Sequence, residues 1–169
     1  IAAAGNDGAN ANVAANRVYP AAFDLPNLVS VAAAGVRGTL AGFSNHGWTI
    51  DVAAPGDAIL STIPSPCETS AGTMTTDCYA WGSGTSMAAP FVSATAALML
   101  GRQPSLTPAQ VASTIKATVR VTGALDVTSG GMLDAGAAMR QVTSDVPVPN
   151  RLGGRDRYVT AAEVAKQFS

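Results

Sequence analysis

The sequence predicts an α/β fold built on a mainly parallel sheet, and three observations lead to this prediction. Short, apolar, β-rich runs bounded by Gly, Pro or Asn indicate buried strands. Longer alanine-rich or capped segments between them indicate helices. Strands that are apolar throughout and alternate with helices are typical of a parallel sheet. At 169 residues the chain fits one modest domain, or part of a larger one.

Buried strands are expected at the beginning of the chain and at two further places. Residues 1–4 form an apolar run that stops at a Gly-Asn turn, and because a domain rarely opens on such a run, we interpret it as the end of a strand that begins upstream. Residues 28–34 lie between a Pro-Asn pair and a glycine. Residues 48–53 are closed by an Ala-Pro-Gly sequence. Each run has the length and boundaries of a strand.

Helices are expected over residues 87–100, 107–118 and 135–142. The first is alanine-rich and apolar on nearly every side, which predicts a central, buried position. The second begins with a capping box, in which Thr107 caps the helix and Gln110 bonds back to it, with proline at the first helical position. Together with the strands, these helices complete the predicted α/β pattern.

The organisation of the chain changes after residue 142. Residues 1–142 are assigned to one domain, and residues 143–150 are polar and interrupted by prolines, which is typical of a linker. Residues 151–169 contain four of the ten basic side chains and a second capping box at Thr160. We therefore expect a domain boundary at the linker. The last residues stop without a helix terminator, so both ends of the chain are interpreted as cut.

The composition excludes several classes of protein. Lys and Arg number 10 and Asp and Glu 11, giving a formal net charge of −1, which argues against a nucleic-acid binder. No apolar run approaches the roughly 18 residues that span a bilayer. Hydrophobic residues make up 47% of the chain, and about a fifth of it is alanine, so most of the chain should fold.

Residues 84–90, Gly-Thr-Ser-Met-Ala-Ala-Pro, place a serine between a glycine turn and the start of a helix. Free backbone N–H groups and the helix dipole favour developing negative charge there, which suits a nucleophile that attacks a carbonyl. Serine is also a favoured N-cap, so from this segment alone Ser86 is either a nucleophile or a helix cap. The G-x-S-x-G elbow of α/β-hydrolases is excluded, because Ala88 occupies its last glycine position.

Combined with other segments in the same order and spacing, this sequence resembles the subtilisin-like serine proteases. The matching segments are Ala3-Ala4-Gly5-Asn6, Tyr19-Pro20-Ala21, Leu28 to Ala33, Phe43-Ser44-Asn45-His46-Gly47, Asp51-Val52-Ala53-Ala54-Pro55-Gly56, the serine segment and Gly131-Met132-Leu133-Asp134-Ala135. The resemblance covers residues 1–142. It implies the C-terminal part of a three-layer α/β fold with a mainly parallel sheet, truncated on its N-terminal side.

The resemblance also implies roles for individual residues. Ser86 would be the nucleophile that forms the acyl-enzyme with a protein or peptide substrate. Asn6 would donate its side-chain amide to the oxyanion, beside the backbone N–H of Ser86. Gly5, Asp7 and Val18 would contact substrate, Val18 by narrowing the primary specificity pocket and Asp7 by favouring basic or neutral side chains. In isolation, Asn6 and Asp7 are equally consistent with turn residues.

Two of the three residues of the catalytic triad that this resemblance implies, the His and the Asp, are absent from this sequence. Acyl transfer needs a general base and an acid that orients it, which in the family come from an Asp-bearing strand and a His-Gly-Thr-His-type helix start upstream of the oxyanion asparagine. His46, the single histidine, is followed by a loop and a strand, and we interpret it as a surface loop residue. The base and acid are therefore expected in a missing N-terminal half, whose absence would leave this chain inactive, with a sheet edge and an apolar helix face uncovered.

A non-catalytic alternative remains open. The chain could be part of a wall-binding or structural protein whose protease domain is degenerate. Asp-x-Gly and His-Gly-Thr segments upstream would favour the enzyme, and their replacement would favour the alternative. The presence of both Ser86 and Asn6 favours the enzyme, since a degenerate site need not keep both.

Cys67 and Cys78 bracket one polar loop and suggest a disulfide, which is consistent with a secreted protein. A metal site is disfavoured, because no second cysteine pair or nearby histidine completes a ligand set. No cofactor is predicted. Calcium commonly binds members of the resembled family, but the chain has no acidic cluster that we assign as its ligands.

Residues 151–169 begin Arg-Leu-Gly-Gly-Arg-Asp-Arg-Tyr-Val-Thr-Ala, which resembles the start of the second common type of cell-wall-binding repeat of Gram-positive bacteria. An ordinary basic turn before a capped helix would give a similar pattern. The resemblance implies further repeats beyond this chain, which would attach a secreted protein to anionic wall polymers through its arginines.

Overall fold

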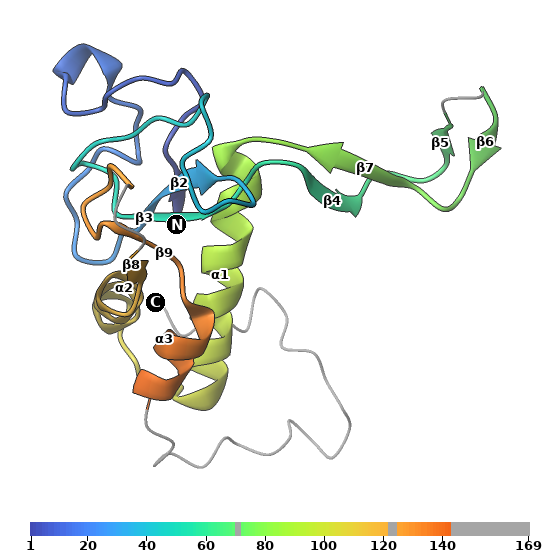
Figure 1. The fold of residues 1–169 in the computed structure, drawn as a ribbon. Helices are drawn as coiled ribbons and strands as arrows, with labels where there is room; N and C mark the ends of the chain where they lie inside the picture. Colours follow the sequence, from blue (N-terminus) through green and yellow to red (C-terminus); the bar gives the residue numbers. More distant parts are fainter. Residues whose placement is uncertain (70–71, 122–124, 143–169) are drawn as a thin grey trace, which may run out of the picture.

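The structure, a computed structural model, describes residues 1–69, 72–121 and 125–142 (Figure 1). Its main sheet has the strand order β1-β2-β3-β9-β8. The strands are β1 (Ala2–Ala3), β2 (Ser30–Ala34), β3 (Val52–Pro55), β9 (Gly131–Met132) and β8 (Arg120–Val121). The first four run parallel and β8 is antiparallel to β9. The predicted α/β fold with a mainly parallel sheet is confirmed.

The alanine content allows the two central strands to be buried on both faces. β2 and β3 pair in register, Val31 opposite Val52 and Ala32 opposite Ala53. Val31 and Val52 belong to the core cluster under the helices, whereas Ala32 and Ala53 belong to a second cluster under the loops of the other face. A strand that is buried on both sides shows a continuous apolar run instead of alternation, which is how these strands could be found in the sequence.

One strand boundary was predicted wrongly. Residues 48–53 were expected to be a strand, but β3 begins at Val52 and residues 48 and 49 form a turn. The prediction took Trp48 as a buried strand residue, but its side chain is 70% exposed. Ile50 is buried, but it packs from the loop before the strand.

Three helices cover one face of the sheet, and the loops and the short 3-10 helix η1 (Ala14–Asn16) lie toward the other (Figure 1). They are α1 (Thr85–Arg102), α2 (Pro108–Ala117) and α3 (Ala135–Gln141). The capping box that predicted α2 is present, with Thr107 and Gln110 bonded to each other in both directions. All three helices therefore form where the sequence predicts them, within two residues at each end.

Helix α1 is buried on one face only, which corrects the expectation that it lies buried on nearly every side. Val92 and Met99 are fully buried against the sheet and its neighbouring helices. On the opposite face Met87, Phe91 and Leu98 are 38%, 41% and 57% exposed. Nothing among the described residues covers these side chains. Likewise, β1 pairs with β2 on one side, and no described strand pairs with its other edge.

A disulfide-linked arm extends away from the body of the molecule (Figure 1). Its base is the antiparallel pair β4 (Ile59–Thr62) and β7 (Tyr79–Gly82), and its tip is the pair β5 (Cys67–Glu68) and β6 (Met74–Thr75). Cys67 and Cys78 form a disulfide across the arm, as predicted from their position around one loop. None of the described helices is both long and apolar enough to cross a membrane.

The disulfide gives a direct chemical test. Both cysteines are paired, so thiol alkylation of the unreduced, denatured chain should add nothing to its mass. Reduction should raise the intact mass by about 2 Da, the mass of two hydrogen atoms, and then allow two alkylations. Alkylation of the chain before reduction would contradict the pairing. A chain carrying both Cys67→Ser and Cys78→Ser is the control, with no change under either condition.

Candidate active site

The loop that follows β1 meets the beginning of α1, and Thr85 joins them. Asn6 Oδ1 accepts hydrogen bonds from the backbone N–H and from the hydroxyl of Thr85, each at 2.9 Å. The same hydroxyl oxygen accepts from the backbone N–H of Gly5 at 3.2 Å. Because Thr85 is only 1% exposed, these bonds lie at the edge of the core and hold the loop against the helix.

These bonds fix the orientation of the Asn6 amide. A backbone N–H can only donate, so the side-chain oxygen must face Thr85 and the Nδ2 group must face away from it. A Cβ placed on Gly84 would lie 3.5 Å from Asn6 Nδ2 and 3.7 Å from the backbone N of Ser86. In the described chain neither of these donors has a hydrogen-bond acceptor. Two unused donors therefore border the same space beside Gly84, as an oxyanion hole requires.

Ser86 lies beside this space as the second residue of α1. The N-cap of α1 is Gly84, so the interpretation of Ser86 as the helix cap is wrong. Its side chain is exposed, and its hydroxyl forms no hydrogen bond to any described residue. The helix N-terminus adds partial positive charge next to this hydroxyl, which favours an oxyanion formed there.

Close packing at Gly56 positions the start of α1. Gly56 follows β3, and its carbonyl accepts from the backbone N–H of Gly84 at 2.8 Å. A Cβ on Gly56 would lie 2.7 Å from Ala33 Cβ and 2.8 Å from the Gly84 carbonyl oxygen, distances that real Cβ atoms do not show. Only glycine fits there, which explains why the residue directly after β3 is glycine.

The predicted substrate-binding residues lie around Asn6. Gly5 has φ +104°, and a Cβ there would lie 2.4 Å from Asn45 Nδ2 and 3.0 Å from Val18 Cγ2, so the position requires glycine. Val18 is half-buried beside it, and Asp7 is exposed. The structure thus brings Gly5, Asn6 and Val18 together, and contact of Gly5, Val18 and Asp7 with substrate stays a prediction.

An apolar groove of about 680 Å³ runs between the arm and the exposed face of α1, and it reaches Ser86. Apart from Ser86 its walls are mostly aliphatic and aromatic. They include Ile59, Leu60 and Trp81 from the arm and Met87, Phe91 and Ala94 from the helix.

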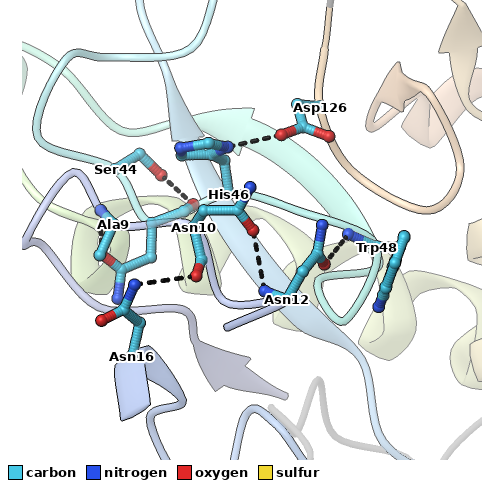
Figure 2. Close-up of polar contacts among 9 residues, drawn as sticks. Ala9, Asn10, Asn12, Asn16, Ser44, His46, Trp48 and Asp126 are labelled. Atoms are coloured by element: carbon cyan, nitrogen blue, oxygen red, sulfur yellow. Dashed lines mark hydrogen bonds and ion pairs between the residues drawn. The ribbon is translucent and has the colours of Figure 1, made fainter. Parts of the chain in front are cut away.

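His46 takes part in a different polar cluster (Figure 2). Its Nδ1 lies 2.5 Å from Asp126 Oδ2, and Figure 2 shows the ring directed at that carboxylate and away from Asn16. Its backbone bonds to Ala9 and Ala11, and no hydrogen bond links it to Ser86 in the described part of the chain. The loop position of His46 was predicted, but its partner was not, because Asp126 is 80 residues away in sequence.

No group of three or more His, Cys, Asp or Glu side chains that could hold a metal occurs in the ranges that the structure describes. The donor set that calcium prefers is rich in carboxylates, so we assign no calcium ligands to these residues.

The sequence of this chain matches one known protein family over the residues that form this site. The model of the subtilase family, Peptidase_S8, matches residues 1–150. The chain belongs to the subtilase family. The match includes Asn6, Gly84 and Ser86, the residues that border the space described above.

Individual relatives of this subtilase chain are proteases. An extracellular basic protease of Dichelobacter nodosus is 39% identical over 86% of the chain, which spans 23% of that protein. Subtilisin of Bacillus pumilus is 36% identical over 81% of the chain, which spans 45% of it. A solved protease structure from Pseudoalteromonas arctica superposes with a TM-score of 0.69 at 36% identity, over 83% of this chain and 42% of that one. The chain thus spans less than half of each relative.

Proposed function

We propose that this chain supplies the nucleophile and the oxyanion hole of a secreted serine endopeptidase. One observation carries the proposal: Asn6 Nδ2 and the Ser86 backbone N–H are unused donors that both border the space beside Gly84, next to Ser86. Donors fixed in advance around such a space stabilise the charge that develops on a carbonyl oxygen under attack. The names of the relatives, which are proteases, support the same class of reaction.

The reaction proceeds through an ester on Ser86. The hydroxyl oxygen attacks the carbonyl carbon of a peptide bond while a general base takes its proton, and the carbonyl oxygen becomes an oxyanion held by the two donors. The tetrahedral intermediate collapses, the C–N bond breaks, and the protonated base gives its proton to the leaving amine. Water, activated by the same base, then attacks the ester and releases the acid product and Ser86.

The general base and the acid that orients it come from sequence outside this chain. His46 is the single histidine of the chain, and no hydrogen bond in the described part of the chain links it to Ser86. The uncovered face of α1, with Met87 and Phe91 exposed, and the unpaired edge of β1 offer a surface for the remainder of the catalytic domain. We therefore propose that the chain alone is inactive. The non-catalytic alternative would require the outside sequence to lack both groups.

Secretion and wall attachment complete the proposal. The relatives named extracellular proteases and the Cys67–Cys78 disulfide support an extracellular location. The resemblance of residues 151–169 to a wall-binding repeat supports attachment to anionic wall polymers. These residues, the predicted linker and the predicted helix at Thr160 lie outside the described ranges.

Labelling with a fluorophosphonate tests the proposal on the protein that includes its upstream sequence. The reagent phosphonylates an activated serine, so peptide mapping should find the label on Ser86, and Ser86→Ala should abolish it. Ser83→Ala is the matched control: Ser83 is an exposed serine three positions earlier, with its hydroxyl donating to Asp57 at 2.8 Å. Labelling should survive in that variant. Label at another residue, or label retained in Ser86→Ala, would contradict the assignment.

A further inference from the structure

Asn45 is a fully buried polar side chain with no part in the proposed reaction. It is 0% exposed and lies between the buried Ser44 and the half-buried His46. A buried amide is costly unless its hydrogen-bonding groups are satisfied. Its side-chain bonds therefore indicate what it stabilises. All three of them, and the bond that its backbone N–H donates, go to the loop that carries Asn6.

The four bonds hold this loop on both sides of Asn6. Before Asn6, Asn45 Nδ2 donates to the Ala4 carbonyl at 3.1 Å and the Asn45 backbone N–H donates to the Gly5 carbonyl at 3.0 Å. After it, Asn45 Oδ1 accepts from the backbone N–H groups of Asp7 and Ala9, each at 3.0 Å. Both lone-pair directions of that oxygen are used by the loop.

Asn6 itself is fixed by little else. It is exposed, and in the described chain its hydrogen bonds are those that its side-chain oxygen accepts from Thr85. The Thr85 bonds orient the amide only if the loop backbone places it within reach. The loop contains Gly5 and Gly8 with φ of +104° and +61°, a conformation that local preferences alone do not impose on a chain.

We propose that Asn45 is a positioning residue for the oxyanion donor: it sets the backbone of residues 4–9 so that Asn6 Nδ2 faces the space beside Ser86. This inference rests on the proposed function and assigns a role to a residue that never touches substrate. Displacing a reacting or stabilising group by about 1 Å can cost up to about 10²-fold in rate. The loss of Asn45 should therefore appear in kcat and depend on Asn6 being present.

A double-mutant cycle on the protein with its upstream sequence tests this role. Asn45→Ala should lower kcat by about tenfold to 10²-fold with KM changed less than about twofold, because transition-state stabilisation is lost and ground-state binding is not. In an Asn6→Ala background the same substitution should have almost no further effect. Equal losses in both backgrounds would show that Asn45 only supports the fold, and would overturn the proposal.

A control variant and a replacement variant separate a specific role of Asn45 from a general effect on folding. Ser44→Ala removes a neighbouring buried hydroxyl that bonds to Ala33 at 2.9 Å and to the Asn45 carbonyl, and kcat should stay within about twofold while thermal stability falls. If Asn45→Ala does not fold, Asn45→Ser, which keeps a polar side chain, replaces it in the cycle. A kcat for Ser44→Ala as low as that for Asn45→Ala would contradict a specific role.

A readout independent of activity separates this inference from the proposed function. Asp7 and Ala9 amides have Asn45 Oδ1 as their acceptor, whereas the Gly8 amide between them donates to the Phe43 carbonyl at 2.7 Å. In Asn45→Ala, hydrogen exchange measured by NMR should accelerate at residues 7 and 9 and stay unchanged at residue 8. Unchanged exchange at residues 7 and 9 would overturn the proposal. If exchange responds as expected but no variant, wild type included, hydrolyses peptides, the proposed function fails and the positioning of the loop stands.

Discussion

The 169-residue chain alone should hydrolyse a peptide substrate about 10⁶-fold more slowly than the same protein with its upstream sequence, the magnitude known for subtilisins whose catalytic base is removed. The reason is the protonation of Ser86. Without an adjacent base its hydroxyl keeps its proton and is a weak nucleophile at neutral pH. The proposed oxyanion hole should still polarise a carbonyl, so we expect a small residual rate above that of water.

The measurement is a comparison of kcat for a chromogenic peptide between the two forms of the protein. Ser86→Ala in the longer form is the control and should fall to a similar residual rate, because residues that act as a unit are not additive. A chain that retains its rate within about tenfold would contradict the missing base. His46→Ala would then show whether His46 acts as the base, although no hydrogen bond links it to Ser86 among the described residues.

The same comparison separates the two function classes. If the longer form is also inactive, and its upstream sequence lacks the Asp-x-Gly and His-Gly-Thr segments, the protein is a non-catalytic member of the family. If the longer form is active, the chain holds the nucleophile side of the site and the upstream sequence holds the base. Asn6 and Ser86, the residues of the proposed oxyanion hole, are present in either case.

Features determined by neighbouring residues could be predicted from the sequence. The capping box at Thr107 and Gln110 depends on residues three positions apart, and it is present in the structure. The disulfide between Cys67 and Cys78 closes a loop with a sequence separation of 11, and it is also confirmed. Ser86 was found from one continuous segment, but that segment could not distinguish a helix cap from an exposed hydroxyl until the helix start was known.

Features that depend on distant contacts could not be predicted. Thr85 meets Asn6 across 79 residues, and His46 meets Asp126 across 80 residues. No local sequence pattern indicates such pairs, since each partner is an ordinary polar residue within its own segment. The strand near Trp48 was predicted to begin too early for a related reason. The sequence does not show whether an apolar residue such as Trp48 lies on the surface or in the core.

Asn6→Ala in the protein with its upstream sequence should reduce kcat by about 10²–10³-fold, the range known for the oxyanion asparagine of subtilisin. KM should change little, because the Nδ2 donor bonds a charge that exists only in the transition state. The free energy of unfolding should also fall, by about 1–3 kcal/mol, because the backbone N–H and the hydroxyl of the buried Thr85 lose their acceptor. The kcat is therefore measured well below the melting temperature of the variant.

Two further variants decide whether the effect belongs to the donor. Asn6→Asp keeps an oxygen that accepts from Thr85 at the present 2.9 Å, but replaces the Nδ2 donor by a second oxygen. Its kcat should fall at least as far as that of Asn6→Ala, because a carboxylate repels an oxyanion. Asn16→Ala is the matched control, an asparagine whose amide donates to the Asn10 carbonyl at 3.1 Å in the cluster of Figure 2. A loss in that control as large as in Asn6→Ala, or a kcat of Asn6→Asp close to wild type, would mean that Asn6 acts through the fold of its loop and donates nothing to the reacting carbonyl.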